Sequence, residues 1–488
     1  MTSLSRPALA LLMIPLLSGM PASAHVAHSF SNIELPELGQ SADLISDSAT
    51  EQRLGQAFLR QLRATTPMWP DPLVRDYVEK LTYRLAVHSP LTDPKFTFVV
   101  VNDRSINAFA VPGGVLGINT GLILSAETEG EVAGVMAHEI GHLSQRHFAR
   151  SQEANRYNQW LALGGLLASI AAASAGGSSG GDLGFAVGAS AQALAIQNRL
   201  SYSRAFEQEA DRIGMQTLTL AGYDPRDMPN FFLRLERSTR QLGYVPEFLL
   251  THPLSTTRLS DLERRVGEQP QRQRINTPDF RLIQARLQVA YSSQINEVIS
   301  AYEESMRSGN PPNYTRLGLS LAYLRQGETA KAKATLAPLL AEEPNRIDYL
   351  VTAMDIAFAE RDFDAAVKLG QRGLAIHPES RTLIERISRP ALALGKPEIF
   401  RMTLENALRQ HPNDIQLWRI MSDTATADKD TMAAFRARAE LFFLSNRLAA
   451  AEDQLNNALR LAANNYSLTA QLQRRLSEMR RLDAEFRR

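Results

Sequence analysis

Apolar residues in the first half of the chain follow first a helical, then a strand-like spacing. Apolar positions at helical spacing run through 51–87, and the Val- and Phe-rich stretch 96–102 is typical of a buried strand. The stretch NAFAVPGGVLGINTGLI at 107–123 predicts a strand, a Pro-Gly-Gly turn and a second strand. Helices are predicted at 125–150, whose first turns are rich in glutamate, and at about 203–221. This order predicts an α+β domain.

The second half of the chain has a helical pattern that repeats. Pro344, Pro378 and Pro412 are spaced 34 residues apart, and a leucine lies four residues before each of them. A helix–turn–helix period of this length, ending in proline, resembles the tetratricopeptide repeat, whose stacks offer a concave face to peptides or partner proteins. The alternative, an unspecialised helical bundle, would not require the same spacing for both residue types.

One further unit of this pattern is out of register. Leu448, Ala451 and Leu459, in the stretch 444–465, match three apolar or small positions of an earlier unit. These residues lie about half a period further along the chain than the 34-residue spacing predicts. We therefore expect the stretch around 415–435 to depart from the repeat.

The N-terminus has the order of a secretory signal. Residues 1–24 contain a short segment with Arg6, an apolar stretch and a small-x-small ending, so we expect export and cleavage before His25. The chain has no cysteine, which excludes disulfides, a thiol nucleophile, a cysteine-ligated zinc and a lipid attached to cysteine. The net charge of +1, with both signs mixed, does not favour a nucleic-acid partner.

An apolar and glycine-rich segment occupies 160–190. Its longest apolar run, at 161–173, is shorter than the roughly 20 residues that span a bilayer. Two interpretations stay open: a helical hairpin packed on the domain, or a lid or surface that faces a membrane or partner.

Composition and pattern divide the chain into four segments. We predict a signal peptide at 1–24, a catalytic domain at 25–265, a linker with the leading helices of the array at 266–310, and repeats at 311–488. The linker is assigned from the polar run GEQPQRQRINTP, which follows residue 266.

The chemistry of the chain is concentrated in HEIGH, at 138–142. His138 and His142 are four residues apart, so on a helix both imidazoles lie on one face and can reach one tetrahedral zinc. Glu139 is positioned to take a proton from the attacking water. Gly141 costs roughly 1 kcal/mol in a helix interior, which suggests that another backbone or a ligand comes close to it.

A catalytic zinc needs a third protein ligand. His147 lies about 500° round the helix from His142, so it is predicted to be solvated and not a ligand. In the second predicted helix, Glu207 and Asp211 share a face, so Glu207 could bind zinc while Asp211 holds a ligand histidine by its other ring nitrogen. For that helix alone, a surface pair near neighbouring arginines is the alternative.

HEIGH followed by FEQEAD resembles peptidase family M48, a family of zinc endopeptidases, over about residues 45–265. The resemblance implies an α+β zincin-like (gluzincin) metalloprotease domain, followed here by an all-α tetratricopeptide-like array. It implies one Zn²⁺ per chain, held by His138, His142 and Glu207, with Glu139 as general base and Asp211 behind a ligand. It also implies an edge strand for substrate at Asn107, Ala108, Phe109 and Ala110.

His252 lies in a His-Pro dipeptide followed by Arg258, a pattern that recurs in this family. A histidine before proline is most often a loop residue with an extended backbone. The second hypothesis makes His252 a regulatory zinc ligand, placed on the fourth position that a catalytic site must keep free. That arrangement would make the resting enzyme self-inhibited.

Together these features predict an exported zinc endopeptidase that cleaves unfolded or stalled polypeptides. The resemblance implies the Gram-negative periplasm, with outer-membrane β-barrel precursors as clients and the barrel assembly machinery as partner of the repeats. Peripheral attachment to the outer membrane is left open. Two alternatives remain: a chaperone or scaffold whose metal site is structural, and a protease with one dedicated substrate. The presence of Glu139 counts against the first, because a structural zinc needs no base.

Overall fold

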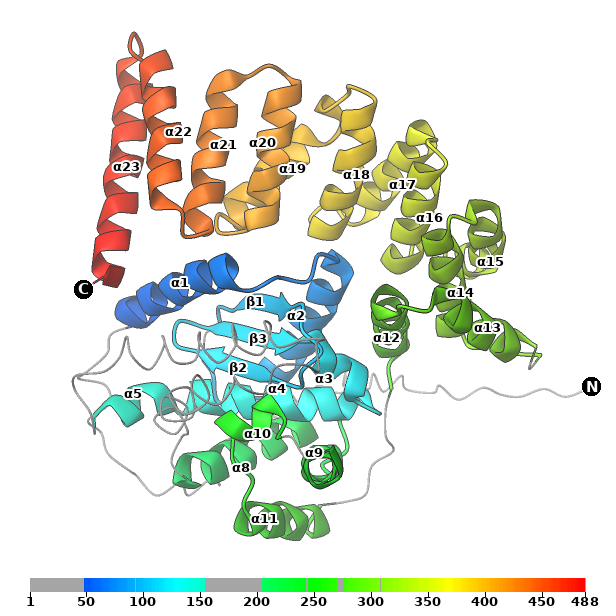
Figure 1. The fold of residues 1–488 in the computed structure, drawn as a ribbon. Helices are drawn as coiled ribbons and strands as arrows, with labels where there is room; N and C mark the ends of the chain where they lie inside the picture. Colours follow the sequence, from blue (N-terminus) through cyan, green and yellow to red (C-terminus); the bar gives the residue numbers. More distant parts are fainter. Residues whose placement is uncertain are drawn as a thin grey trace, which may run out of the picture. The chain divides into compact units, whose positions relative to one another are not determined.

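A computed structural model gives the fold of the chain (Figure 1). It describes residues 48–92, 94–153, 204–242, 245–269, 276–307 and 309–487. The predicted signal peptide at 1–24 and the apolar segment at 160–190 lie outside these residues. No helix in the described part of the chain combines the length and apolar character that a membrane span requires.

Three strands form a small mixed sheet. They are β1 (Thr97–Val101), β2 (Ala108–Val111) and β3 (Val115–Asn119), in the order β1-β3-β2. β1 pairs in parallel with β3, and β2 pairs antiparallel with β3, so β2 is an edge strand of this sheet. Gly113 and Gly114 form the β2–β3 turn with φ angles of 80° and 78°, a region that favours glycine. The predicted strand-turn-strand at 107–123 is therefore confirmed as far as Asn119, whereas residues 120–123 lie in a short helix.

Helices cover both faces of the sheet. On one face, α1 (Ser48–Thr65) packs through Leu54, Phe58 and Leu62 against alternate residues of the strands. On the other face lie α2 (Pro72–Ala86), α3 (Thr120–Ser125) and α4 (Glu129–Ser144). The continuous helical pattern predicted for 51–87 is two helices, because three prolines and an Asp71 N-cap end one and begin the next.

The predicted helix at 125–150 is also divided. Thr128 caps the start of α4 by accepting a hydrogen bond from the backbone N–H of Glu131. α4 ends at Ser144, and Arg146 adopts a positive φ of 49° before α5 (His147–Glu153) begins in a new direction. This break changes the direction of every side chain beyond residue 145.

The described residues 48–267, which contain the predicted catalytic domain, are called the catalytic region, and its remaining helices follow in the chain. The predicted helix at 203–221 is α8 (Arg204–Leu220), and Gly222 follows its end with a φ of 93°. After it come α9 (Asp227–Leu242), α10 (Glu247–Thr251) and α11 (Thr256–Gly267).

The described residues from 276 onward form a helical repeat array. Its helices pair in sequence, and the first helix of each pair begins 33–35 residues after the previous one. The pairs are α12 (Pro278–Tyr291) with α13 (Ile295–Met306), α14 (Asn313–Gln326) with α15 (Thr329–Glu342), α16 (Ile347–Ala359) with α17 (Phe363–Ile376), α18 (Arg381–Ala393) with α19 (Glu398–Gln410), α20 (Ile415–Ala427) with α21 (Thr431–Leu444), and α22 (Leu448–Leu461) with α23 (Tyr466–Arg487).

The expected departure at 415–435 is wrong for the helix positions. α20 begins at Ile415, on the same period as the first helices of the earlier pairs. α22 then occupies the place of a first helix, although its small and apolar residues match those of second helices. Both kinds of helix need small residues at their close approaches, so the sequence match alone misplaced the unit.

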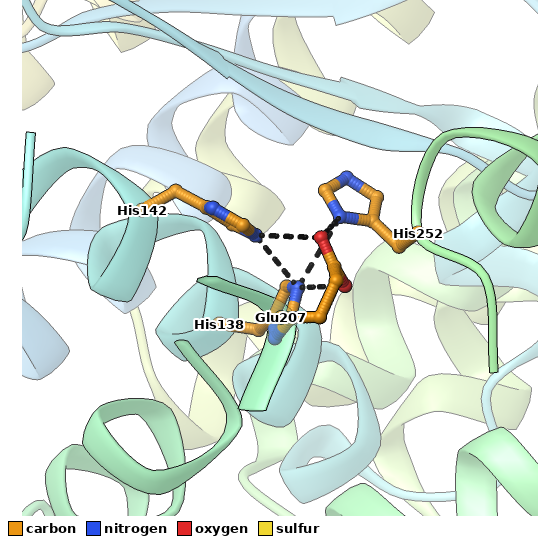
Figure 2. A group of neighbouring side chains, drawn as sticks. All are labelled: His138, His142, Glu207 and His252. Carbon is orange, nitrogen blue, oxygen red and sulfur yellow. Dashed lines mark hydrogen bonds and ion pairs between the residues drawn. The ribbon is translucent and has the colours of Figure 1, made fainter. Parts of the chain in front are cut away.

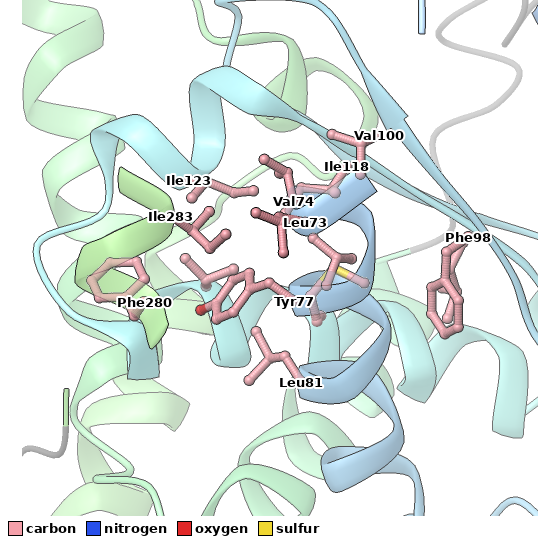
Figure 3. Packing of buried hydrophobic residues seen from close by; sticks show 14 of the residues in the cluster. Leu73, Val74, Tyr77, Leu81, Phe98, Val100, Ile118, Ile123, Phe280 and Ile283 are labelled. Atoms are coloured by element: carbon pink, nitrogen blue, oxygen red, sulfur yellow. The ribbon is translucent and has the colours of Figure 1, made fainter. Parts of the chain in front are cut away.

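The core of the catalytic region continues into the array. Leu73, Tyr77 and Leu81 on α2 belong to the same buried cluster as Phe280 and Ile283 on α12 (Figure 3). All described residues lie within one compact unit, Ser41–Arg488. The predicted boundary at 266–310 therefore contains a helix that is part of the catalytic region's own core.

Candidate metal centre

The site is built on two helices, α4 and α8, whose backbones come close together at two glycines. A Cβ added to Gly141 on α4 would lie 2.9 Å from the carbonyl oxygen of Ala210 on α8. A Cβ added to Gly214 on α8 would lie 2.9 Å from the backbone nitrogen of His138 on α4. The prediction that another backbone approaches Gly141 is confirmed, and this contact holds the two helices side by side.

Four side chains meet where α4 and α8 pack (Figure 2). His138 and His142 come from α4, Glu207 comes from the first turn of α8, and His252 follows α10. All four are buried, and one donor atom from each lies within 4.8 Å of the others. The alternative that placed Glu207 on the surface is wrong.

The spacing of these donors fits a tetrahedral metal ion. Ligands at about 2.0–2.1 Å from a zinc ion are about 3.3 Å apart along each edge of the tetrahedron. His138 Nε2 lies 3.0 Å from His142 Nε2, 3.3 Å from His252 Nδ1 and 3.5 Å from Glu207 Oε2. Glu207 Oε1 lies 3.4 Å from His142 Nε2 and 3.1 Å from His252 Nδ1. These five distances are compatible with a metal ion, and the donor set can hold one.

The electrostatics of the cluster also favour a cation. Burial lowers the pKa of His138, but the carboxylates of Asp211 and Glu207 outweigh it and raise that pKa to about 9. Burial would raise the pKa of Glu207, but His252 and the neighbouring histidines hold it well below its usual range. The carboxylates thus stabilise positive charge at His138, whereas burial and the neighbouring histidines hold the pKa of His142 well below its usual range, which favours the neutral ring that binds a metal.

Asp211 and Arg258 stand behind the donors. Asp211 Oδ1 lies 3.0 Å from His138 Nδ1, the ring nitrogen on the side away from the cluster. The buried Arg258 on α11 holds both oxygens of Asp211 at 2.6 and 2.7 Å and reaches Glu207 Oε2 at 2.8 Å. This contact of Asp211 with a histidine of the cluster is the one that the sequence analysis expected. The sequence analysis named Arg258 only as the arginine that follows the His-Pro dipeptide. No local pattern in the sequence indicated that its side chain would be buried against Asp211 and Glu207.

Glu139 lies beside the cluster and faces the sheet. Its carboxyl is buried, and its pKa is raised by burial, although His252 and His138 oppose the shift. The backbone N–H of Ala110 in β2 also favours the ionised carboxylate and so opposes the raised pKa. The base predicted from the sequence therefore sits between the donor cluster and the edge strand.

The predicted substrate strand is present, but most of it is covered. Asn107, Ala108 and Phe109 are buried, and the carbonyl oxygen of Asn107 accepts a hydrogen bond from the backbone of Asn119. Ala110 is partly exposed. Among the described residues β2 pairs only with β3.

His252 contacts both the metal donors and the carboxylate beside them. Its Nδ1 belongs to the four-donor cluster, and its Nε2 lies 3.4 Å from Glu139 Oε1. Arg258 fixes the loop that follows by donating to the carbonyl oxygen of Pro253 at 2.8 Å. His252 is thus a residue outside the helices, as its place before proline suggests, but its side chain is buried in the site.

The prediction that His147 is solvated is wrong. Its side chain is fully buried, and its Nδ1 lies 2.8 Å from His142 Nδ1. The prediction extended the helix through 150, whereas the break at Arg146 turns His147 back toward α8. No glycine or proline marks that break in the sequence, so the local pattern could not have shown it.

Comparison with known proteins decides the family. The sequence model of peptidase family M48 matches residues 72–266. The chain is 31% identical over 457 residues to the beta-barrel assembly-enhancing protease of Escherichia coli (strain K12), which covers 93% of this chain and 92% of that protein. The chain belongs to peptidase family M48.

Further relatives agree with this assignment. The M48 peptidase is 30% identical over 455 residues to the beta-barrel assembly-enhancing protease of Yersinia pestis, covering 93% of each chain. It is 29% identical over 192 residues to the mitochondrial metalloendopeptidase OMA1 of Schizosaccharomyces pombe, covering 39% of this chain and 53% of that protein. The protein is thus a metallopeptidase, and the four-donor cluster can hold its metal.

Proposed function

We propose that the protein is an exported zinc endopeptidase that cleaves unfolded or stalled polypeptides during the assembly of outer-membrane β-barrel proteins. The observation that supports it most is the buried cluster of three histidines and one glutamate, with Glu139 beside it. A structural metal site has no use for such a carboxylate, whereas peptide hydrolysis needs a base at that place.

In this proposal His138, His142 and Glu207 are the protein ligands of one Zn²⁺. Zinc bound there supplies polarisation of the attacking water and of the substrate carbonyl. Glu139 takes the proton from the water and later gives it to the leaving amine. Its buried surroundings favour this role, because a raised pKa makes the carboxylate a stronger base near neutral pH. Asp211 orients His138, and Arg258 keeps Asp211 ionised.

The substrate is proposed to bind as an extended strand along β2. The backbone of Asn107, Ala108, Phe109 and Ala110 would pair with it, which suits chains of varied sequence because backbone groups are common to all of them. Ala110 and His142 also line a cavity of about 380 Å³, together with apolar residues such as Leu143 and Phe148. A substrate side chain next to the scissile bond could enter that cavity.

We infer that His252 keeps the resting enzyme inactive. Its Nδ1 stands where a catalytic site needs an open position, and its Nε2 lies close to the proposed base. Movement of the loop from Thr251 to Arg258 would free both positions. Binding of a client or partner would then activate the enzyme by shifting this equilibrium.

The cellular setting is proposed from the relatives and from the pattern of the chain. Two relatives that align along almost their whole length are named for beta-barrel assembly, so we propose barrel precursors as clients. The secretory pattern at 1–24 supports a periplasmic location. The helical array, with its tetratricopeptide-like period, would bind the barrel assembly machinery or its clients.

Casein hydrolysis tests the proposed chemistry. The mature His252→Ala variant, loaded with Zn²⁺, is expected to degrade casein faster than the wild type, because the blocking imidazole is gone. Adding Glu139→Gln to that variant should lower the rate by a factor of about 10² or more, since one proton-transfer group is lost. The Zn²⁺ content of this double variant, measured by chelator titration, should equal that of His252→Ala. Equal rates with and without Glu139 would contradict the proposal and favour a scaffold.

A further inference from the structure

A second layer of polar contacts lies behind His142. His142 Nδ1 is 2.8 Å from His147 Nδ1, and His147 Nε2 is 3.0 Å from Glu209 Oε2 on α8. Arg150 on α5 holds the same carboxylate oxygen at 2.9 Å. His147 is fully buried, so these contacts are sheltered from water.

Only one arrangement of protons satisfies this chain when His142 acts as a ligand. The Nε2 lone pair of His142 points into the donor cluster, so its proton is on Nδ1. That N–H then donates to the Nδ1 lone pair of His147, whose own proton is therefore on Nε2. This second N–H donates to Glu209, which as a carboxylate can only accept.

We propose that His147 is a positioning residue for the metal centre. It fixes the tautomer and the ring orientation of His142, and Glu209 is the final acceptor of the chain. The inference rests on the proposed role of His142 as a metal ligand. It adds a second orienting contact to the one that Asp211 makes with His138, so that both histidines of HEIGH are held from behind.

The surroundings of His147 hold it in this position. Its ring stacks on Phe206, with centroids 4.5 Å apart and planes 12° from parallel. The guanidinium of Arg150 lies over the ring of Phe206, 4.6 Å from its centroid. Phe206 and Glu209 flank Glu207 on α8. The same turn of one helix therefore presents a metal donor to one side and the support of another donor to the other side.

Metal affinity separates this role from a purely structural one. Asparagine at position 147 can place its side-chain oxygen where Nδ1 of the imidazole lies, and so keeps an acceptor for His142. Leucine fills the buried space but offers none. We expect His147→Leu to bind Zn²⁺ about 10- to 100-fold more weakly than the wild type, and His147→Asn to recover most of that loss. Packing alone would favour leucine over asparagine in a fully buried site.

The measurement is competition for Zn²⁺ with a chromophoric chelator, on the mature full-length protein. The visible spectrum of the Co²⁺-loaded variants should change for leucine and resemble the wild type for asparagine. Melting temperatures with EDTA show whether each variant folds. Wild-type affinity in His147→Leu, or equal losses in both variants, would overturn the proposal.

A second pair of variants tests the far end of the chain if the first pair folds poorly. Glu209→Gln keeps a carbonyl acceptor for His147, whereas Glu209→Ala removes it; only the alanine variant should lose affinity. Equal affinities for this pair would contradict the role of Glu209. His138→Ala serves as the reference for the metal site itself. If His138→Ala also retained full Zn²⁺ affinity, the proposed set of metal ligands would be contradicted, and not only the positioning role of His147.

Discussion

At the scale of single residues, the buried charges of the site depend on Arg258. Glu207 and Asp211 are almost fully buried, and two carboxylates without a cation nearby would be strongly destabilising there. Arg258 contacts both, and it also bonds the carbonyl oxygen of Pro253. A planar fork of five donors makes these contacts at once, so lysine could not replace it. One side chain thus links the carboxylates of α8 to the loop of His252.

A buried carboxyl near this loop predicts a pH effect on stability. Glu247 on α10 accepts a hydrogen bond from Ser105 at 3.1 Å. Burial and the charge of Asp103 raise its pKa to about 7, although Ser105 and Asn107 oppose the shift. The folded state therefore holds this proton more tightly than the unfolded state, whose pKa is near 4.5. The resulting stability is complete below pH 4.5 and is lost as the pH rises to about 7.

Glu247→Gln imitates the protonated form at every pH. We expect the melting temperature of this variant, relative to the wild type, to rise between pH 5 and pH 8 and to level off above that. The full effect is at most about 3–4 kcal/mol, since each pKa unit corresponds to about 1.4 kcal/mol. Thermal scans in a buffer series measure it. A difference that stays constant across this range would show that Glu247 ionises normally.

The residues that the sequence could predict are those fixed by local spacing. His138, Glu139 and His142 share one turn of a regular helix, and Glu207 and Asp211 share one face of another, so helical geometry alone pairs them. The burial of His147 was not predicted, because its position depends on a helix break at Arg146, and no glycine or proline marks that break in the sequence. His252 stayed open because a contact 114 residues away from His138 has no local pattern.

At the scale of elements, the close packing of α4 and α8 determines the spacing of the donors. His138 and His142 come from one helix and Glu207 from the other, so the distance between the helices sets the distance between the donors. Gly141 and Gly214 permit that distance, because any side chain there would meet the backbone of the other helix.

Gly141→Ala should therefore weaken both the fold and metal binding. Its Cβ would meet the Ala210 carbonyl oxygen at 2.9 Å, and backbone cannot move aside without separating the helices. We expect a loss of about 1–3 kcal/mol in the free energy of unfolding and a clear drop in Zn²⁺ affinity. Gly267, at the end of α11, has open space around its Cβ position and is the control. Alanine there should be neutral or stabilising by up to about 1 kcal/mol.

Urea unfolding and chelator competition measure the two effects. An unchanged Zn²⁺ affinity in Gly141→Ala would mean that the helices tolerate a wider spacing than the donor geometry suggests.

Element types were more predictable than element ends. The strand-turn-strand at 107–123 and the 34-residue period were clear, because glycine, proline and apolar spacing all mark them. The divisions within 51–87 and 125–150 were missed, since apolar spacing continues across a short turn that changes helix direction. The unit near 448 was misplaced because first and second helices of a pair present similar small residues.

At the scale of the whole molecule, the catalytic region and the array share one core. Leu383 and Ile384 on α18 belong to the same buried cluster as Leu73 and Tyr77 on α2. Polar contacts join the same elements: Arg75 on α2 pairs with Glu385 on α18 at 2.7 Å. Deleting 311–488 would expose this core, so a truncation could not separate binding by the repeats from catalysis.

The shared core predicts that both regions unfold together. Calorimetry of the mature chain should give one cooperative transition. Glu385→Ala leaves the half-buried Arg75 without its nearest carboxylate, although Asp76 and Asp414 remain within 4 Å. We expect it to lower the free energy of unfolding by about 1–3 kcal/mol and to broaden or divide the transition.

Glu452→Ala is the matched control for this experiment. Its partner Arg480 is largely exposed and lies within the array, so the change should have little effect on stability and leave the transition single. Two well-separated transitions in the wild type would contradict the shared core. They would place the thermodynamic boundary within 266–310, where the sequence pattern put the linker. A single transition would mean that a client bound to the repeats acts on the same cooperative unit that holds α4 and the metal centre.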